Sequence, residues 1–182
     1  LVDAPFAVDP LLSAAKQLGS QLTHILLTHR HFDHLLGAEK VRELTGAQIY
    51  IPERDADGLR KEEESAAALM GFAGMQTPAE PDRLLRDGET FACGKLEFTL
   101  LETPGHTAGG GCYLCGDVLF TGDTLFDRGV GRTDLPGGNE GLLAQSLARL
   151  RDLPGDYQLC PGHGGTSTLN IQRACNPYLL YL

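Results

Sequence analysis

The sequence predicts an α/β (α+β) fold in which two β-sheets lie between layers of helices. In the first half of the chain, apolar runs with the profile of buried strands alternate with helical patterns. In the second half, short strands are separated by Gly-rich turns. The length of 182 residues suits one domain with a sizeable core and is short for two. We therefore expect residues 1–182 to form a single domain.

The first half is expected to contain four helical segments and two strands. Asp9 and Pro10 have the profile of an N-cap followed by a proline at the first helical position, and Gly19 ends that helix. The run Ile25-Leu26-Leu27 is typical of a strand buried on both faces. In order, the expected elements are a helix over 9–18, a strand over 24–28, a helix over 37–45, a strand over 48–51, a short helix over 52–58, and a solvated helix and loop over 60–81.

The second half is expected to contain five strands and two helices. Leucines recur at helical spacing between residues 142 and 153, and Pro177 stops the last helix. The expected elements are strands over 90–92, 95–102, 111–114 and 118–121, a helix over 142–153, a strand over 158–160 and a helix over 168–176.

The net charge and the cysteine content limit the kinds of binding partner and the cellular compartment that we expect. The formal net charge is −9 and no basic stripe is present, which argues against nucleic acid and anionic membranes as partners. No apolar stretch approaches the roughly 20 residues that span a bilayer. Five cysteines at irregular spacing and the lack of a signal-peptide pattern fit the cytoplasm or an organelle matrix. The sequence gives no indication of the oligomeric state.

The segment 28–34, Thr-His-Arg-His-Phe-Asp-His, is the strongest functional signal. It places four ligand-type side chains, those of His29, His31, Asp33 and His34, directly after a buried strand. Imidazole and carboxylate are the ligands that zinc, iron and manganese take at about 2.0–2.2 Å. Such a group is costly to bury unless it is paired or bound to a metal.

Three further strand ends carry ligand-type residues. His106 and His163 each lie in a Pro-Gly-His turn, where the glycine allows a sharp bend, and Asp123 follows the strand over 118–121. Strand ends of a sandwich can converge on one edge, so we expect these residues to join the first motif. His24 lies inside a strand and is interpreted as structural.

The single CxxC, Cys112 to Cys115, is also interpreted as structural. It lies within a predicted strand, where residues three apart face opposite sides, and no second pair accompanies it. Cys160 is expected to be a buried strand residue.

These motifs together resemble the metallo-β-lactamase superfamily, and within it the glyoxalase II-like (hydroxyacylglutathione hydrolase-like) thioesterases. The resemblance extends over nearly the whole chain. The stretches that carry it are 26–34, 103–107, 120–126, 131–138 (Gly-Arg-Thr-Asp-Leu-Pro-Gly-Gly), 161–164 and 176–179.

The resemblance implies an αββα sandwich with two divalent metal ions, zinc in the first place, with iron or manganese also compatible. By position, the ligands would be His29, His31 and His106 for one metal, Asp33, His34 and His163 for the other, and Asp123 as the bridge. Asp33 and Asp123 are the carboxylates to which we assign the catalytic role. Two metals would lower the pKa of a bridging water towards about 7, and the resulting hydroxide would attack a carbonyl without a side-chain nucleophile.

The substrate implied is a small thioester of the S-lactoylglutathione type. Arg128 and Arg132 are the candidate residues for binding an anionic substrate, although Arg132 could instead pair with Asp134 and fix its loop. Only 19 residues follow His163, so the C-terminal helical region with which glyoxalase II enzymes bind glutathione is missing. Compared with the family that the sequence resembles, we also expect the first strands of the fold to be absent before Leu1, as in a trimmed chain.

Two other readings are left open. The persulfide dioxygenase branch shares the His motif and the Gly-Arg-Thr-Asp stretch, and would use one iron bound by His29, His106 and Asp123. A metal-binding module without turnover is the non-enzymatic reading. Lactamase activity also occurs in the superfamily, as does nuclease activity, although no added domain for nucleic acid is visible.

Overall fold

A three-stranded parallel sheet organises residues 1–85, the first of two units into which the computed structural model divides. The structure describes residues 1–182. The strands, in the order β1-β2-β3, are β1 (His24–Leu26), β2 (Gln48–Pro52) and β3 (Arg83–Leu85). Ile25, Ile49 and Ile51 are fully buried, as expected for parallel strands covered on both faces. Val2 adds a parallel bridge to Leu26 at the edge of this sheet.

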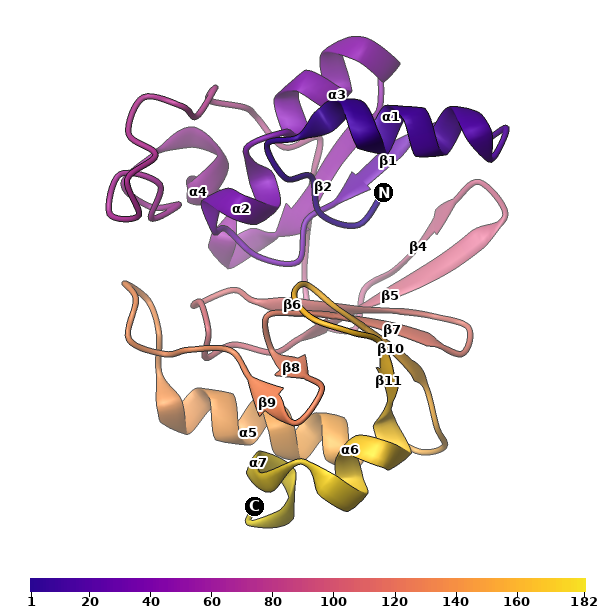
Figure 1. Cartoon of the computed structure of the whole chain (residues 1–182), viewed down its shortest axis with the longest axis vertical. Helices are drawn as coiled ribbons and strands as arrows, with labels where there is room; N and C mark the ends of the chain where they lie inside the picture. Colours follow the sequence, from indigo (N-terminus) through magenta and orange to yellow (C-terminus); the bar gives the residue numbers. More distant parts are fainter. The chain divides into compact units, whose positions relative to one another are not determined.

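The helices of the first unit pack on this sheet (Figure 1). They are α1 (Val8–Gln17), α2 (Phe32–Leu35), α3 (Ala38–Thr45) and α4 (Asp57–Arg60), with a 3-10 turn η1 (Glu53–Asp55) before α4. Helix α3 contacts both α1 and β2. It ends, as predicted, at Gly46, which adopts a left-handed conformation with φ 73°.

Some boundaries in the first unit differ from the prediction. Helix α1 begins at Val8 with Ala7 as N-cap, so Asp9 lies inside the first turn, where its charge favours the helix dipole. Strand β1 ends at Leu26 and not at residue 28, because the chain leaves the sheet to form the ligand loop. Residues 60–81 form turns and contain no helix beyond Arg60, and strand β3 was not predicted.

The second unit, residues 86–182, contains a six-stranded sheet of order β11-β10-β7-β6-β5-β4. Strands β4 to β7 form an antiparallel meander, and β10 pairs in parallel with β7. A two-stranded hairpin, β8–β9, follows β7. The strands are β4 (Thr90–Cys93), β5 (Leu96–Glu102), β6 (Gly111–Cys115), β7 (Val118–Gly122), β8 (Leu125–Phe126), β9 (Gly129–Val130), β10 (Gln158–Pro161) and β11 (Ser167–Thr168).

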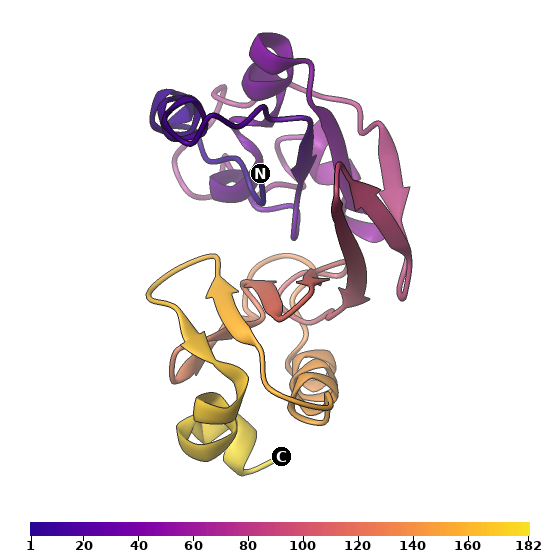
Figure 2. The ribbon, with the colours of Figure 1, turned by 90° about the vertical axis from the view of Figure 1, so that its right-hand side faces the viewer.

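Three helices cover one face of this second sheet: α5 (Glu140–Arg151), α6 (Leu169–Cys175) and α7 (Pro177–Leu180). Figures 1 and 2 both show them on the same side of the strands. Leu143, Leu147 and Leu150 of α5 are buried against Leu119 and Leu159 of the sheet, which confirms the predicted leucine face.

The second unit follows the prediction closely, with small differences at the ends of elements. Asn139 caps α5 by accepting a hydrogen bond from the Leu142 amide, so the helix begins at Glu140. Pro177 ends α6 as expected, but it also opens α7. Strands β8, β9 and β11 have only two residues each and were not predicted.

The residues interpreted as structural are found within strands. Cys112 is fully buried in β6, and burial raises the pKa of its thiol to about 11, while Cys115 is half-buried. Cys160 lies in β10 but is only half-buried, because it stands at the end of the strand. His24, in β1, contacts the Tyr50 ring edge-on.

The predicted α/β (α+β) class, with two sheets and covering helices, is therefore confirmed. None of the helices is both long and apolar enough to cross a membrane. The assignment of residues 1–182 to a single domain stays a prediction, since the chain is described here as two units.

Candidate metal centre

In the first unit, the ligand loop is compact because it passes directly from an extended segment into a helix. His31 has extended backbone angles and is the N-cap of α2, whose first turn contains Asp33 and His34. The ring centroid of His29 lies 4.9 Å from that of His31 and 4.2 Å from that of His34. Nε2 of His34 lies 3.7 Å from the Asp33 carboxylate. The four predicted ligands of this loop are thus brought together, and the three histidines are buried.

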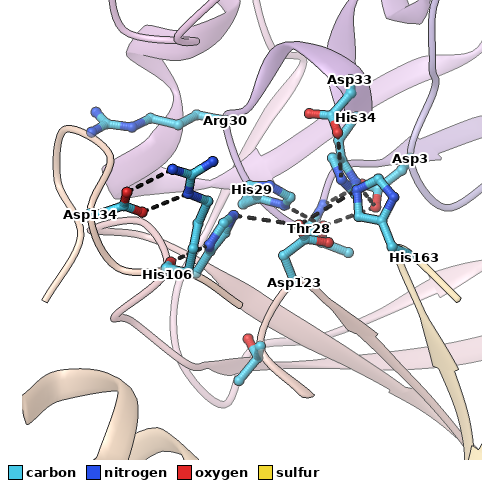
Figure 3. Close-up of polar contacts among 12 residues, drawn as sticks. Asp3, Thr28, His29, Arg30, Asp33, His34, His106, Asp123, Asp134 and His163 are labelled. Atoms are coloured by element: carbon cyan, nitrogen blue, oxygen red, sulfur yellow. Dashed lines mark hydrogen bonds and ion pairs between the residues drawn. The ribbon is translucent and has the colours of Figure 1, made fainter. Parts of the chain in front are cut away.

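Asp3 fixes the orientation of two of these rings. Its carboxylate accepts hydrogen bonds from the Thr28 amide (2.8 Å), the Thr28 hydroxyl (2.9 Å) and Nδ1 of His34 (2.8 Å), as Figure 3 shows. Because the Thr28 hydroxyl donates its proton to Asp3, its oxygen accepts from Nδ1 of His29, 2.9 Å away. Nε2 is then the nitrogen that both rings can offer to a metal, as in metal sites whose histidines are held by outer hydrogen bonds.

The second unit supplies its three ligands from three strand ends. His106 follows β5, Asp123 follows β7 and His163 follows β10. Strands β7 and β10 are neighbours, and the Gly162 amide donates to the Gly122 carbonyl at 2.9 Å. This pairing brings Asp123 and His163 to the same edge of the sheet.

Asp123 stands between the two histidines of this unit. Its Oδ2 lies 3.5 Å from Nε2 of His106 and 3.6 Å from Nε2 of His163. Two ligands of one tetrahedral metal, each bonded at about 2.1 Å, are roughly 3.4 Å apart. One carboxylate oxygen therefore has metal-ligand spacing to two different imidazoles.

The protons on His106 give a further test of fit to a metal. Nδ1 of His106 lies 2.7 Å from the Arg132 carbonyl, which can only accept, so Nδ1 carries the hydrogen. In the neutral ring, Nε2 then presents a lone pair toward the carboxylate of Asp123. A cation between these two atoms would convert a repulsive contact into two coordinate bonds. The donor set of this unit therefore fits a metal ion.

Glycines make these close approaches feasible. A Cβ on Gly131 would lie 1.8 Å from the Asp123 carbonyl oxygen and 2.9 Å from Nδ1 of His106. Gly105, before His106, has φ 138°, as expected for the Pro-Gly-His turn. In the second such turn the left-handed glycine is Gly164, after His163, with φ 84°.

The two predicted substrate-binding arginines have different surroundings. Nε and Nη2 of Arg132 each donate a hydrogen bond to the Asp134 carboxylate at 2.6 Å. The alternative in which Arg132 pairs with Asp134 and fixes its loop is therefore present in the structure. The Arg132 guanidinium holds the pKa of Asp134 down at about 2. Arg128 is exposed and has φ 57°, and its amide donates to the Gln172 side chain at 2.8 Å. Their role in substrate binding stays a prediction.

Several supporting residues were missed in the sequence. Asp3 lies 25 residues from Thr28 and belongs to no recognisable motif. Asn176 was noted only as part of the resemblance. Its side-chain amide donates to the carbonyls of Phe126 and Gly129 and thereby fixes the β8–β9 hairpin. Asn directly before Pro177 was the available sequence signal for a capping role, and the structure shows that Asn176 is fully buried.

Comparison with known proteins identifies the family. Residues 1–163 match the metallo-beta-lactamase superfamily. The chain belongs to this superfamily, whose fold agrees with the α/β class predicted from the sequence and with solved structures of related proteins.

Several relatives carry the names of hydrolases, and two of them show the range. A probable metallo-hydrolase of Streptococcus pyogenes is 32% identical over 186 residues, which cover 98% of this chain and 79% of the relative. A hydroxyacylglutathione hydrolase of Rhodospirillum rubrum is 37% identical over 163 residues, which cover 87% of this chain and 55% of that longer protein. The chain is therefore a member of a superfamily of metal-dependent hydrolases.

Three solved structures are similar over nearly the whole chain. BLEG-1 B3 metallo-beta-lactamase matches with a TM-score of 0.92 and 30% identity, covering 98% of this chain and 87% of that one. TTHA1623 in a di-iron-bound form matches with a TM-score of 0.87 and 34% identity (98% and 88% coverage). ETHE1 from Myxococcus xanthus matches with a TM-score of 0.78 and 32% identity (97% and 71% coverage).

Proposed function

We propose that this chain is a binuclear metal-dependent thioesterase that hydrolyses acylthioesters of the S-lactoylglutathione type. In this proposal, the ligands of the two units bind one pair of divalent metal ions. Asp123 would be shared by both ions, His29, His31 and His106 would hold one of them, and Asp33, His34 and His163 would hold the other. Zinc, iron and manganese all accept this set of imidazole and carboxylate donors.

The position of Asp123 is the observation that carries the two-metal proposal. Oδ2 of Asp123 has two imidazole neighbours, at 3.5 and 3.6 Å, as a carboxylate shared by two ions requires. Seven ligand-type side chains in the chain are also more than one tetrahedral metal takes. His106 and His163 come from different strand ends, so each can serve a different ion. The di-iron form of the similar TTHA1623 is consistent with a site for two metals.

When bound, the metals would supply hydroxide at neutral pH by lowering the pKa of a water molecule. The chain's own residues prepare for this chemistry. Asp3, Thr28 and the Arg132 carbonyl hold the Nδ1 atoms of three rings, so their Nε2 atoms are oriented before any metal binds. Preorganised ligands of this kind need no rearrangement during the reaction.

The thioester substrate is supported by the subgroup resemblance and by one relative. The stretch 131–138 resembles glyoxalase II-like thioesterases, and the hydroxyacylglutathione hydrolase of R. rubrum matches over 87% of this chain. The exposed guanidinium of Arg128 is one candidate for binding an anionic part of the substrate.

The test combines metal analysis with a thioesterase assay on the purified chain. We expect two divalent metals per chain and hydrolysis of S-lactoylglutathione that is lost on chelation and restored by zinc, iron or manganese. His24→Gln, which removes a histidine outside the ligand set, should keep both the metal content and the activity. Metal-loaded protein that hydrolyses no acylthioester would refute the proposal.

The same experiment distinguishes the thioesterase from the alternative function, a mononuclear iron persulfide dioxygenase. One iron per chain, with oxygen uptake on glutathione persulfide and no thioester hydrolysis, would favour that activity. The match to ETHE1 makes this a necessary control. Because BLEG-1 also matches, a β-lactam belongs in the substrate panel.

A further inference from the structure

An uncharged and apolar segment lies beside the ligand loop of the first unit. Residues 65–79 contain no charged side chain, although the chain as a whole has a net charge of −9, and they include both of its methionines. Four large apolar side chains of this segment are exposed: Leu69 (64%), Met70 (44%), Phe72 (37%) and Met75 (39%). Grouped exposed apolar side chains are typical of a binding surface. We call residues 65–76 the apolar lip.

The apolar lip is attached directly to the metal-ligand loop. The ring of Phe72 stacks on the ring of Phe32, with centroids 4.7 Å apart and planes inclined by 29°. Phe32 stands between the ligands His31 and Asp33, and its amide donates to the Ser65 carbonyl at 2.9 Å. The lip therefore begins at the side chain that separates two predicted metal ligands.

A second set of contacts fixes the two ends of the lip. Before it, Glu64 bonds Arg30 of the ligand loop at 2.7 Å. At its other end, Gln76 accepts from the Ser65 hydroxyl at 2.5 Å and donates to the Gly58 carbonyl at 2.6 Å. Ser65 is fully buried. With both ends held, the exposed side chains between them are kept next to the ligand loop.

We infer that the apolar lip binds the acyl group of the substrate, and that the preferred thioesters have alkanoyl or aromatic acyl groups. This inference rests on the proposed function, since it takes the reacting carbonyl to lie at the metal ligands. An acyl group that extends from this carbonyl past Phe32 reaches Phe72, and Leu69, Met70 and Met75 are the other exposed apolar side chains of the lip. Methionine side chains adapt to apolar groups of different shape. A small hydroxylated acyl group, such as lactoyl, has too little apolar surface to gain from the lip.

A binding experiment tests the inference without requiring turnover. The metal-loaded chain is titrated by calorimetry with S-hexylglutathione and S-methylglutathione, two thioethers that cannot be hydrolysed. We expect at least about tenfold tighter binding of the hexyl compound, since full burial of each added methylene corresponds to about fourfold. In Leu69→Ser/Met70→Ser, which leaves the stack of Phe32 and Phe72 in place, the preference should fall below about threefold. Leu44→Ser, at a leucine on α3 whose exposure (54%) lies between those of Leu69 and Met70, is the matched control and should keep the preference.

Kinetics then distinguishes failure of the inference from failure of the proposed function. The value of kcat/KM for acetyl, butanoyl and hexanoyl thioesters of glutathione should rise with chain length, and the rise should be lost in the double variant. Hydrolysis without any dependence on chain length, or an unchanged hexyl preference in the double variant, would overturn the role of the lip. Hexyl-selective binding without hydrolysis would leave the lip in place and refute the thioesterase. A dimer that the double variant dissolves would instead assign the lip to self-association and overturn the inference.

Discussion

The two units supply metal ligands in opposite ways. In the first unit, four ligands lie within six consecutive residues, and a carboxylate from outside the motif, Asp3, orients them. In the second unit, three single ligands come from three strand ends that are distant in the sequence, and no two of them share a loop. One half of the ligand set is thus a local motif, and the other half exists only once a sheet has formed.

This difference indicates which substitutions should disturb each half of the ligand set. The spacing of His29, His31 and His34 depends on one loop and its hydrogen bonds. The spacing of Asp123 and His163 depends on the register between β7 and β10, which shifts by one residue between Cys160 and Pro161. Such an irregularity re-aims the residues that follow it. Substitutions in the first unit should therefore act locally, while those in the second act through the sheet and its helices.

The largest effect is expected from Asp123→Asn, which removes the carboxylate between His106 and His163. An amide is a poor bridge between two cations. We expect the bound metal to fall below two per chain and kcat/KM to fall by more than the roughly 10²–10³-fold that follows loss of one preorganised electrostatic group. Asp117→Asn, in the exposed turn before β7, is the matched control. Full metal content and activity in the Asp123 variant would contradict the bridging role.

A smaller effect is expected from Asp3→Asn, which tests the local half of the comparison. The amide cannot accept from the Thr28 amide, the Thr28 hydroxyl and Nδ1 of His34 as the carboxylate does. Loss of such an outer contact lowers metal affinity or activity by about 10–100-fold. Metal affinity measured by competition with a chelator is the readout, with Asp9→Asn on α1 as the control. An unchanged affinity would show that the loop orients its rings without Asp3.

An effect on stability is expected from Asn139→Ala, which tests how the second half depends on its helices. The Asn139 side chain caps α5, and the backbone N–H of Asn139 donates to the Gly105 carbonyl, next to His106. Loss of an N-cap costs about 1 kcal/mol. Urea unfolding should show this loss, and Asn139→Asp, which retains a capping oxygen, should restore most of it. Equal stability of the Ala and Asp variants would argue against the cap.

The smallest effect concerns Asp134→Asn, which removes the ion pair with Arg132. The folded-state pKa of Asp134 is depressed to about 2, so the pair stabilises the fold above the ordinary carboxyl pKa and loses its effect as pH falls toward 2. Because the pair is exposed, the gain is small. The difference in Tm between the wild type and the variant should be constant from about pH 7 to 5 and then shrink to zero. A difference that grows on acidification would have the wrong sign.

Patterns within a few residues were predicted correctly, and so was the grouping of His106, Asp123 and His163. The contacts that support the ligands were not predicted. The histidine motif and the leucine face of α5 depend on spacing within a few residues, and both are present as predicted. The strands of the meander were found because glycine turns separate them. Strands β8, β9 and β11 were missed because each has two residues and too little alternation to detect.

The supporting contacts of the site could not have been predicted from a single sequence. Nothing in the residues around Asp3 indicates that its carboxylate accepts from Thr28 and His34, because the sheet edge at Val2 and Leu26 brings it there. The apolar lip was read as a solvated helix and loop on account of its flanking charges. Its position beside the ligand loop depends on the contact of Phe72 with Phe32, 40 positions away in the sequence.

The location of Asp3 has a practical consequence for handling the protein. The carboxylate that orients His34 is held in place by the pairing of Val2 with Leu26, and the exposed residues 5–7 follow it. A proteolytic cut within residues 5–7 would leave every predicted metal ligand on one fragment. It would nevertheless separate Asp3 from that fragment, so that His34 and Thr28 would lose its carboxylate. Preparations that differ only by such a cut should therefore differ in metal content at the same total concentration of metal.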